Sequence, residues 1–350
     1  MISDIDFSLP LEGQPITIAV TRGDLIESRH AVWAAVVHAT GRIIGQWGNA
    51  HAMIYPRSAV KPFQALPLVM SGAAQRFGLD ARHVALACAS HNGERQHVDL
   101  VLDWLQRLNL TPAHLECGAT EPIDAQTALA VIREGGVSRP EYNNCSGKHC
   151  GFLTLARHLA ADPSGYIEYG HPVQAEVRRA MALIFDHELE SAPWGIDGCG
   201  IPTYALSIAD LAHAFARFAA PSALPEDARQ AASFLFQAMT AHPYLVGGRN
   251  RFDTEVMACL PGALMVKSGA EGVCAAGIPD RGLGIVTKVV DGARRASDVA
   301  MGAVLRHLGV LADSDWQRLK AYCAPEVRNV AGKAVGVIRP CADPACAKEG

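Results

Sequence analysis

Segments with the character of β-strands stand at both ends of this 350-residue chain, and segments with helical periodicity fill the middle. An isolated two-stranded hairpin is marginal in water, so strands from the two ends are expected to share one sheet. The chain should therefore close on itself as a mixed antiparallel sheet. The expected strands are short, rich in Val, Ile, Thr and Trp and bounded by glycine and aspartate turns, at 16–20, 31–38, 42–48, 263–267, 272–276, 284–290 and 334–338.

Apolar residues recur at helical spacing between the two groups of strands. Pro172 and Pro225 fit the first turn of a helix, where the missing N–H costs nothing. The expected helices cover 63–77, 93–108, 127–133, 146–159, 172–189, 208–218 and 225–241, with one more at 296–308 among the C-terminal strands.

This order of segments predicts an α+β fold in which a helical lobe packs beside the sheet. We find neither an internal repeat nor a low-complexity linker that would separate two domains. The prediction is one domain over residues 16–340, with the sheet from 16–56 and 263–340, the helical lobe from 58–262, an N-terminal extension over 1–15 and a tail over 341–350.

The composition of the chain excludes several classes of function. About half of the residues are hydrophobic, and 31 basic residues nearly balance 35 acidic ones, so the chain can bury a large core. There is no basic block or aromatic-interleaved Lys/Arg stripe for nucleic acid, and no stretch approaches the ~20 apolar residues of a membrane span. Residues 1–14 lack the charged start and apolar run of a signal peptide. We expect a cytoplasmic protein that acts on a small molecule.

Ser58 and Lys61 are three residues apart at an expected helix start, which places them one turn apart on the same face. A neutral lysine there can take the serine proton, and a second cation such as Lys267 would lower its pKa. Two later motifs complete the order S-x-x-K, S-x-N and K-S-G, at Ser90–Asn92 and Lys267–Gly269. Together they indicate a serine acyl-transferring enzyme with lysine as base.

Each of these motifs also has an ordinary explanation. S-x-x-K arises by chance, Asn92 fits the N-cap of the following helix, and Lys267 fits a strand-end lysine that faces solvent. It is the order of all three that favours a catalytic site.

Two short stretches around Cys145 and Cys199 are dense in potential metal ligands. Neither has zinc-finger spacing, so a mononuclear site would need ligands from both stretches, for example Cys145 and Cys199, with Lys148, His149 or Cys150 as the third ligand. A catalytic thiol and a buried structural pair are the alternatives. The ten cysteines of the chain are expected to be free, buried or metal-bound rather than paired in disulfides, and Cys341 and Cys346 fall in the tail.

Five motifs in order resemble the bacterial L-asparaginase II family of the Rhizobium type, over roughly residues 17–338. They are Arg57–Pro62, Ser90–Glu94, Asn144–His149, Asp197–Pro202 and Lys267–Gly272. The resemblance implies a fold like those of serine β-lactamases and glutaminases. It also implies hydrolysis of L-asparagine to L-aspartate and ammonia.

The resemblance further implies roles for individual residues. The catalytic residues would be two Ser/Lys pairs, Ser58 with Lys61 and Ser90 with Lys267; a Zn²⁺ ion would be held by Cys145, Lys148 and Cys199, with Asp197 and His149 in support. We expect Ser58 to attack the amide carbon with Lys61 as base, and Ser90 to relay a proton to ammonia. For the substrate, we expect Arg57 to pair with the α-carboxylate, Glu94 or Glu271 with the α-ammonium, and Asn92 to contribute.

Several alternatives stay open at this stage. The same Ser/Lys motifs fit a glutaminase or a penicillin-recognising serine hydrolase or peptidase. A zinc-dependent binding module without catalysis and a cysteine-dependent amidohydrolase are the others. We also expect a homodimer, although no sequence feature identifies the interface.

Overall fold

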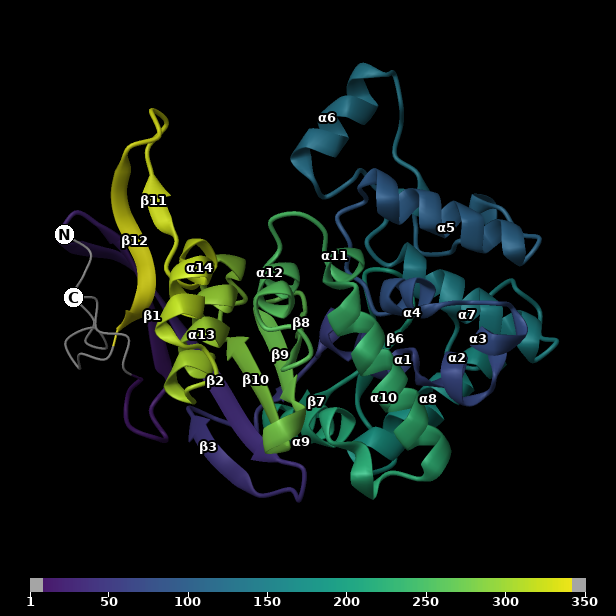
Figure 1. Cartoon of the computed structure of the whole chain (residues 1–350), viewed down its shortest axis with the longest axis horizontal. Helices are drawn as coiled ribbons and strands as arrows, with labels where there is room; N and C mark the ends of the chain where they lie inside the picture. The colour runs from purple at the N-terminus through teal and green to yellow at the C-terminus, as the bar shows by residue number, and fades with distance from the viewer. Residues whose placement is uncertain (1–8, 342–350) are drawn as a thin grey trace. The chain divides into compact units, whose positions relative to one another are not determined.

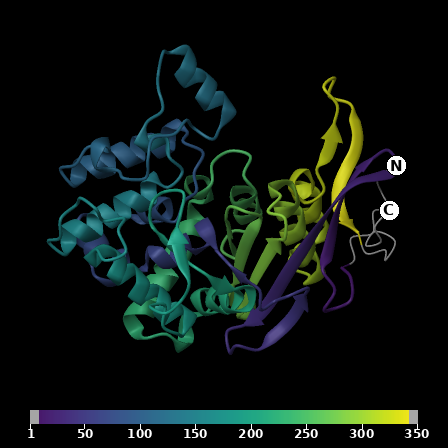
Figure 2. The same ribbon diagram turned by 180° about the vertical axis from the view of Figure 1, so that it is seen from behind.

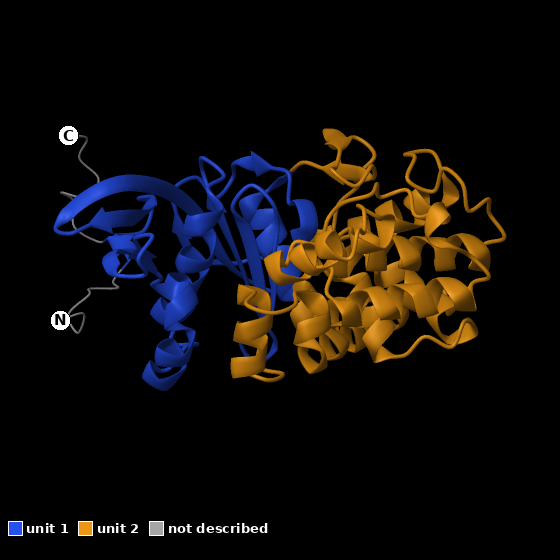
Figure 3. Cartoon of the chain, turned by 90° about the horizontal axis from the view of Figure 1, so that it is seen from above, with its two compact units in different colours: residues 1–59, 206–216, 266–350 blue, residues 60–205, 217–265 orange. Residues whose placement is uncertain are grey.

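The computed structural model describes residues 9–341, and the chain divides into two compact units. Unit 1 joins the N-terminal part up to Ala59 with Leu206–Ala216 and the part from Val266 onward. Unit 2 consists of Val60–Ala205 and Arg217–Met265. Figure 3 shows the sheet in unit 1 and most of the helices in unit 2.

Strands from both ends of the chain form one sheet in unit 1, as predicted. The sheet order is β11-β12-β1-β2-β10-β9-β8, with β3 paired to β2. Strand β1 pairs with β12, and β2 pairs with β10, both antiparallel. The strands are β1 (Ile16–Arg22), β2 (Leu25–His38), β3 (Ile43–Trp47), β8 (Met265–Ser268), β9 (Val273–Ile278), β10 (Leu283–Val289), β11 (Glu326–Arg328) and β12 (Ala334–Cys341). The predicted α+β class with an antiparallel sheet is confirmed.

Helices α13 (Arg294–His307) and α14 (Asp313–Cys323) pack together, and α13 also contacts β1, β9, β10 and β12. They lie in front of the sheet in Figure 1 and behind it in Figure 2, so they cover one face. Helix α9 (Ile208–Ala219) approaches β10 closely, because a Cβ on Gly284 would lie 1.8 Å from the carbonyl oxygen of Ala212.

The segment before α9 differs from the prediction. Strand β7 (Leu206–Ser207) pairs with β4 (Met53–Ile54), which places Leu206–Ala216 in the sheet unit rather than in the helical one. The two-residue strands are too short to show a period in the sequence, so only the tertiary pairing reveals them.

Unit 2 is mainly helical. The expected helix over 63–77 is broken into three pieces, because Pro67 interrupts the backbone hydrogen bonding and Gly72 has a left-handed φ of 78°. No helix within residues 9–341 has the length and apolar character needed to cross a membrane. The elements are α1 (Lys61–Gln64), α2 (Leu66–Met70), α3 (Ala73–Arg76), α4 (Ala81–Ala87), α5 (Arg95–Arg107), α6 (Ala125–Arg133), α7 (Ser146–His158), α8 (Pro172–Phe185), β5 (Trp194–Ile196), β6 (Pro202–Tyr204), α10 (Glu226–Ala241), α11 (Pro243–Val246) and α12 (Phe252–Cys259).

Helix α7 is the central helix of unit 2, and its residues 146–156 are all buried. A Cβ on Gly147 would lie 2.3 Å from the carbonyl oxygen of Leu86 in α4, so only glycine permits this approach. The close packing of α4 and α7 places Lys148 and Ala87, the last residue of α4, around one small cavity.

The cysteines follow the expectation with one exception. Eight are free and buried: Cys88, Cys117, Cys145, Cys150, Cys199, Cys259, Cys274 and Cys323. Cys341, at the end of β12, is instead disulfide-bonded, which corrects the expectation for that residue. Cys346 lies outside the described residues.

Candidate active site

Lys61 is the first residue of α1, and its side chain is only 1% exposed. Its Nζ donates to Ser90 Oγ at 3.0 Å, to the Ala89 carbonyl at 2.5 Å and to the Asn144 carbonyl at 3.3 Å. The amine of Lys61 therefore joins the segment after α4 to the segment before α7. We had not predicted this Lys61–Ser90 pairing.

Ser90 lies in the irregular segment between α4 and α5, and it is buried. Its backbone N–H donates to the Val246 carbonyl at 2.9 Å, and the N–H of His91 donates to the Asn144 carbonyl at 3.3 Å. Hydrogen bonds to two different segments thus fix the backbone on which the Ser90 hydroxyl is presented.

Ser58 belongs to unit 1, in the 3₁₀ turn Arg57–Val60 that precedes α1. The end of β8 packs on this turn: a Cβ on Gly269 would lie 2.7 Å from the Pro56 carbonyl oxygen. Lys267, two residues earlier, is buried and donates from Nζ to the Ser268 carbonyl at 2.7 Å. Unit 1 therefore brings the Ser58 turn and the K-S-G motif together, and Lys267 does not face solvent.

The two units divide the four predicted catalytic residues. Ser58 and Lys267 are in unit 1, whereas Lys61 and Ser90 are in unit 2. Within unit 2 the structure brings Lys61 to Ser90, and within unit 1 it packs the segments of Ser58 and Lys267 against each other. The pairings Ser58–Lys61 and Ser90–Lys267 stay predictions.

Arg57 and Glu271 share an uncommon backbone conformation. Their φ angles are 53° and 57°, in the left-handed region that costs a non-glycine residue roughly 1–2 kcal/mol. Both lie in unit 1, Arg57 directly before Ser58 and Glu271 in the exposed turn after β8. Such strain concentrates at functional sites, and both are predicted substrate contacts.

Cys145, Lys148 and Cys199 converge in the interior of unit 2. Lys148 Nζ donates to Cys199 Sγ at 3.0 Å. The hydrogen bond with Cys199 lowers the pKa of Cys145 well below its usual range against the effect of burial, with help from the Lys61 and Lys148 charges. The same hydrogen bond and burial raise the pKa of Cys199.

The Lys148 ammonium is strongly favoured in this cluster. Burial opposes its charge, but Cys199, Cys145 and Asp197 together raise the pKa of Lys148 above its usual value. Asp197 thus acts on the cluster through its charge, and its support of a metal site stays a prediction.

The donor set fits a soft divalent cation. The two thiols are ligands that zinc accepts as thiolates, and the Lys148 amine beside them would complete a set of three only after it loses the proton that its raised pKa retains. Across residues 9–341, no set of three or more His, Cys, Asp and Glu side chains is placed to bind a metal, so the lysine is needed to complete a set of three.

One nitrogen of the His149 ring is hydrogen-bonded and the other is not. Nδ1 lies 2.7 Å from the Tyr166 hydroxyl, which accepts from the Glu116 N–H at 2.9 Å. Nε2 is buried without a hydrogen-bond partner.

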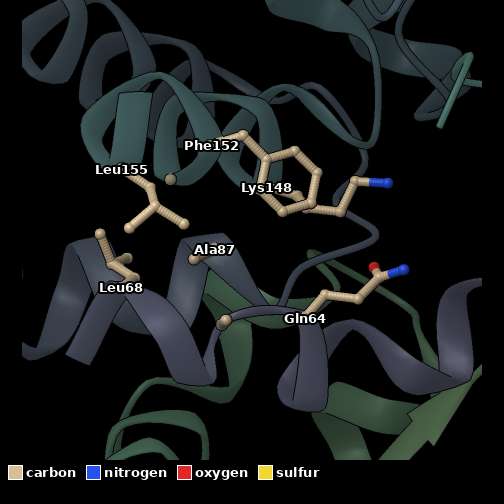
Figure 4. A pocket seen from close by; sticks show the side chains of 8 residues that line it. Gln64, Leu68, Ala87, Lys148, Phe152 and Leu155 are labelled. Carbon is tan, nitrogen blue, oxygen red and sulfur yellow. The ribbon is translucent and has the colours of Figure 1, made fainter. Parts of the chain in front are cut away.

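Lys148 also lines a small cavity between α1, α2, α4 and α7 (Figure 4). The volume open to water is about 10 Å³, which is room for about one water molecule. The polar ends of Gln64 and Lys148 lie on the same side of it, away from Leu68 and Leu155. An amino-acid substrate does not fit here.

The sequence reasoning missed the segment Val246–Arg251, which we call the strap. The Glu94 carboxylate holds it: Oε1 accepts from the Arg249 backbone N–H at 2.8 Å and from Asn92 Nδ2 at 3.2 Å. Oε2 accepts from the Tyr244 hydroxyl at 2.7 Å and from Arg249 Nε at 2.9 Å. Although burial opposes it, these bonds lower the pKa of Glu94, so the carboxylate is charged.

Asn92 also binds the strap. Its Nδ2 donates to the Arg249 carbonyl at 2.9 Å, and its Oδ1 accepts from Arg251 Nη1 at 3.1 Å. The N-cap of α5 is Glu94, not Asn92. A signal for the strap was present in Gly247-Gly248: Gly248 has φ 105°, and a Cβ there would lie 2.6 Å from Glu94 Oε1.

Comparison with known proteins gives one family and several distant structures. The L-asparaginase II family model matches residues 18–340. No curated protein matches the sequence.

Three solved structures illustrate the structural similarity. The native form of Mglu has 14% identity and a TM-score of 0.38, over 80% of this chain and 64% of that one, so the chain spans less than two thirds of Mglu. A beta-lactamase from Mycobacterium bovis has 16% identity and a TM-score of 0.40, over 80% and 95%. A beta-lactamase from Sphaerobacter thermophilus has 11% identity and a TM-score of 0.38, over 81% and 93%.

Proposed function

The chain belongs to the L-asparaginase II family, and on that premise we propose that it hydrolyses the side-chain amide of L-asparagine to L-aspartate and ammonia. The observation that carries this proposal is the buried hydrogen bond between Lys61 and Ser90. A buried lysine in contact with a serine hydroxyl is the arrangement through which an amine moves a proton to or from that hydroxyl.

In the proposed reaction, Ser58 Oγ attacks the amide carbon and its proton passes to Lys61. Ser90 gives its proton to the leaving nitrogen and regains one from Lys61, to which it is hydrogen-bonded. The nitrogen departs as ammonia and leaves a β-aspartyl ester on Ser58. Water then hydrolyses the ester and restores the serine proton. Lys267 supplies a second cation that favours the neutral form of the lysine base.

The backbone strain at Arg57 and Glu271 supports their proposed roles with the substrate carboxylate and ammonium. Asn92 and Glu94 were expected to join them. Their side chains already bond to the strap, so we propose that they act on substrate binding through the strap.

We also propose that Cys145, Lys148 and Cys199 hold a zinc ion, with Asp197 and His149 around them. When bound, zinc would supply a fixed positive charge. The protein itself holds the Cys145 segment in place, because the carbonyl of the neighbouring Asn144 accepts a hydrogen bond from Lys61. A homodimer and a cytoplasmic location also stay predictions.

A coupled ammonia assay on L-asparagine and L-glutamine tests the function. We expect ammonia from L-asparagine with the wild type, and loss of turnover by at least about 10³-fold in Ser58→Ala and Ser90→Ala. Failure of the wild type to release ammonia from either amide contradicts the proposal. Rapid turnover of a chromogenic β-lactam instead would favour the penicillin-recognising alternative.

A further inference from the structure

His91 follows Ser90 directly, and the proposed reaction gives it no part. Its side chain is fully buried in the segment that joins α4 to α5. Burial is the main cause that lowers the pKa of His91 well below its usual range, and nearby positive charges add to it, so the ring is neutral. A buried polar ring needs hydrogen-bond partners, and both nitrogens of His91 have one within unit 2.

The hydrogen bonds of His91 determine which nitrogen carries the proton. The backbone N–H of Gly93 donates to Nδ1 at 3.1 Å, and a backbone N–H only donates. In the neutral ring the proton is therefore on Nε2, which donates to Ser146 Oγ at 2.9 Å. The Ser146 hydroxyl in turn donates to the Glu141 carbonyl at 3.2 Å. Donor and acceptor roles are thus fixed along the whole series of hydrogen bonds.

This series attaches the segment of Ser90 to Ser146, the first residue of α7. The backbone N–H of His91 contacts the same stretch, because it donates to the Asn144 carbonyl at 3.3 Å. Lys61 Nζ donates to that carbonyl as well, also at 3.3 Å. The serine and the amine that bonds to it are therefore held against one short stretch of backbone.

Two further rings hold the plane of the imidazole. The rings of His91 and His97 are stacked, with centroids 4.8 Å apart and 10° between their planes. His97 stacks on Tyr244 with centroids 5.2 Å apart, and its Nε2 donates to the Tyr244 carbonyl at 3.0 Å. A close-packed ring does not turn without displacing its neighbours. The two nitrogens of His91 consequently keep their directions.

These contacts fix the backbone on both sides of Ser90. Its own N–H donates to the Val246 carbonyl at 2.9 Å, and the side chain of the next residue closes the turn to Gly93. A catalytic group must be held within about 0.5 Å of its productive position. The side chain of His91 is therefore placed to set the position of the Ser90 hydroxyl.

We propose that His91 is a positioning residue for Ser90: through Gly93 and Ser146 it holds the hydroxyl where it gives a proton to the leaving nitrogen. This inference rests on the proposed function and extends it to a residue that acts through its neighbour. If His91 is only a core residue, its loss lowers activity by a factor that does not depend on the leaving group.

The experiment compares L-asparagine with the β-methyl ester of L-aspartate. An amide nitrogen leaves only after it gains a proton, whereas an ester oxygen leaves with much less proton transfer. Loss of the proton donor therefore lowers kcat/KM more for the amide than for the ester. We expect His91→Phe to lower kcat/KM by about 10²-fold for L-asparagine and by less than about tenfold for the ester. The ratio of the two values, amide over ester, then falls.

Two other variants calibrate this ratio. Ser90→Ala is the reference, because loss of the donor itself should lower the ratio in the same direction. His83→Phe is the matched control: His83 is another buried histidine of unit 2, and its Nδ1 bonds to Asp80 at the start of α4. It should keep the wild-type ratio. A ratio that falls in Ser90→Ala but stays at the wild-type value in His91→Phe would overturn the inference.

Ser146→Ala tests the same series of hydrogen bonds with a smaller change. It removes the acceptor of the Nε2 proton and leaves the imidazole in place. We expect the ratio to fall by about 3- to 10-fold, the effect of one lost neutral hydrogen bond. This variant decides if thermal unfolding shows that His91→Phe is not folded. An unchanged ratio in Ser146→Ala would overturn the inference even where His91→Phe has an effect.

The proposed function can fail separately from this inference. If the wild type releases no ammonia from L-asparagine, or if Ser90→Ala keeps the ratio, the proposed reaction is contradicted whatever His91 does. Crystal structures of the wild type and Ser146→Ala then test the positioning role. A Lys61–Ser90 hydrogen bond that is lost or lengthened in the variant supports it, and an unchanged bond overturns it.

Discussion

Lys61 Nζ donates a 3.0 Å hydrogen bond to Ser90 Oγ in the interior of unit 2. The same nitrogen also contacts the backbone carbonyls of Ala89 and Asn144. Lys61 lies three residues after Ser58 in the sequence and bonds directly to Ser90. We therefore consider Lys61, rather than either serine, the centre of the proton transfers.

Removal of this amine is the first prediction. Lys61→Met should lower kcat by about 10²–10⁴-fold, the usual contribution of a positioned acid or base. Steady-state ammonia release measures it, with Lys333→Met at an exposed position as the control. Retention of turnover within tenfold of the wild type would show that another group moves the protons.

Gly269 provides a test of the turn that carries Ser58 in unit 1. An added Cβ would lie 2.7 Å from the Pro56 carbonyl oxygen, so Gly269→Ala should displace the turn that carries Ser58. We expect kcat to fall by roughly 10- to 100-fold, because small misplacements of a nucleophile are costly. Gly170→Ala is the control, since no atom lies within 4 Å of its added Cβ. Unchanged kcat in Gly269→Ala would mean that the turn does not set the position of the nucleophile.

The strap gives a pH prediction for stability. The pKa of Glu94 is lowered from 4.5 in the folded protein, where burial opposes the shift and bonds from Arg249, Tyr244 and Asn92 outweigh it. A lowered folded pKa means that the contribution of Glu94 is fully present above about pH 4.5 and is lost as the pH falls through the folded value.

Urea unfolding of the wild type and Glu94→Gln at several pH values measures this contribution. The difference in free energy of unfolding should be largest near neutral pH and shrink below pH 4.5. A difference that stays constant over this range would show that the charge of Glu94 does not stabilise the fold.

Zinc binding is tested independently of turnover. The purified protein should bind about one zinc ion per chain in competition with a chelating dye. Cys199→Ser and Lys148→Met should weaken binding by roughly 100-fold or more, because each removes a ligand. Cys259→Ser, which changes another buried free thiol, should not. Equal affinity in Lys148→Met and wild type would exclude the lysine as a ligand.

The sheet was predictable because its strands carry local signals. A composition rich in Val, Ile, Thr and Trp, bounded by turn residues, marked β1, β2 and β10, and the marginal stability of isolated hairpins implied that the two chain ends pair. Pro172 likewise marked the start of α8. The single helix expected over 63–77 was wrong, because Pro67 and Gly72 divide this periodic stretch into three short helices.

The contacts within the site were less predictable. Lys61 and Ser90 are 29 residues apart, and Glu94 and Arg249 are 155 residues apart. The sequence around each residue therefore contains no signal that predicts these hydrogen bonds. The Ser/Lys spacing suggested which residues matter but not which of them meet. The left-handed backbone of Arg57 also had no signal, because glycine is the usual residue in that conformation.

The identity of the acylated serine is the most direct test of the account. L-asparagine is mixed with the enzyme, the reaction is quenched in acid within one turnover, and peptide mass spectrometry locates the aspartyl ester. We predict that the ester is on Ser58. It should accumulate in any variant that slows the hydrolysis of this ester by water. An ester on Ser90, or on Cys145, would contradict it.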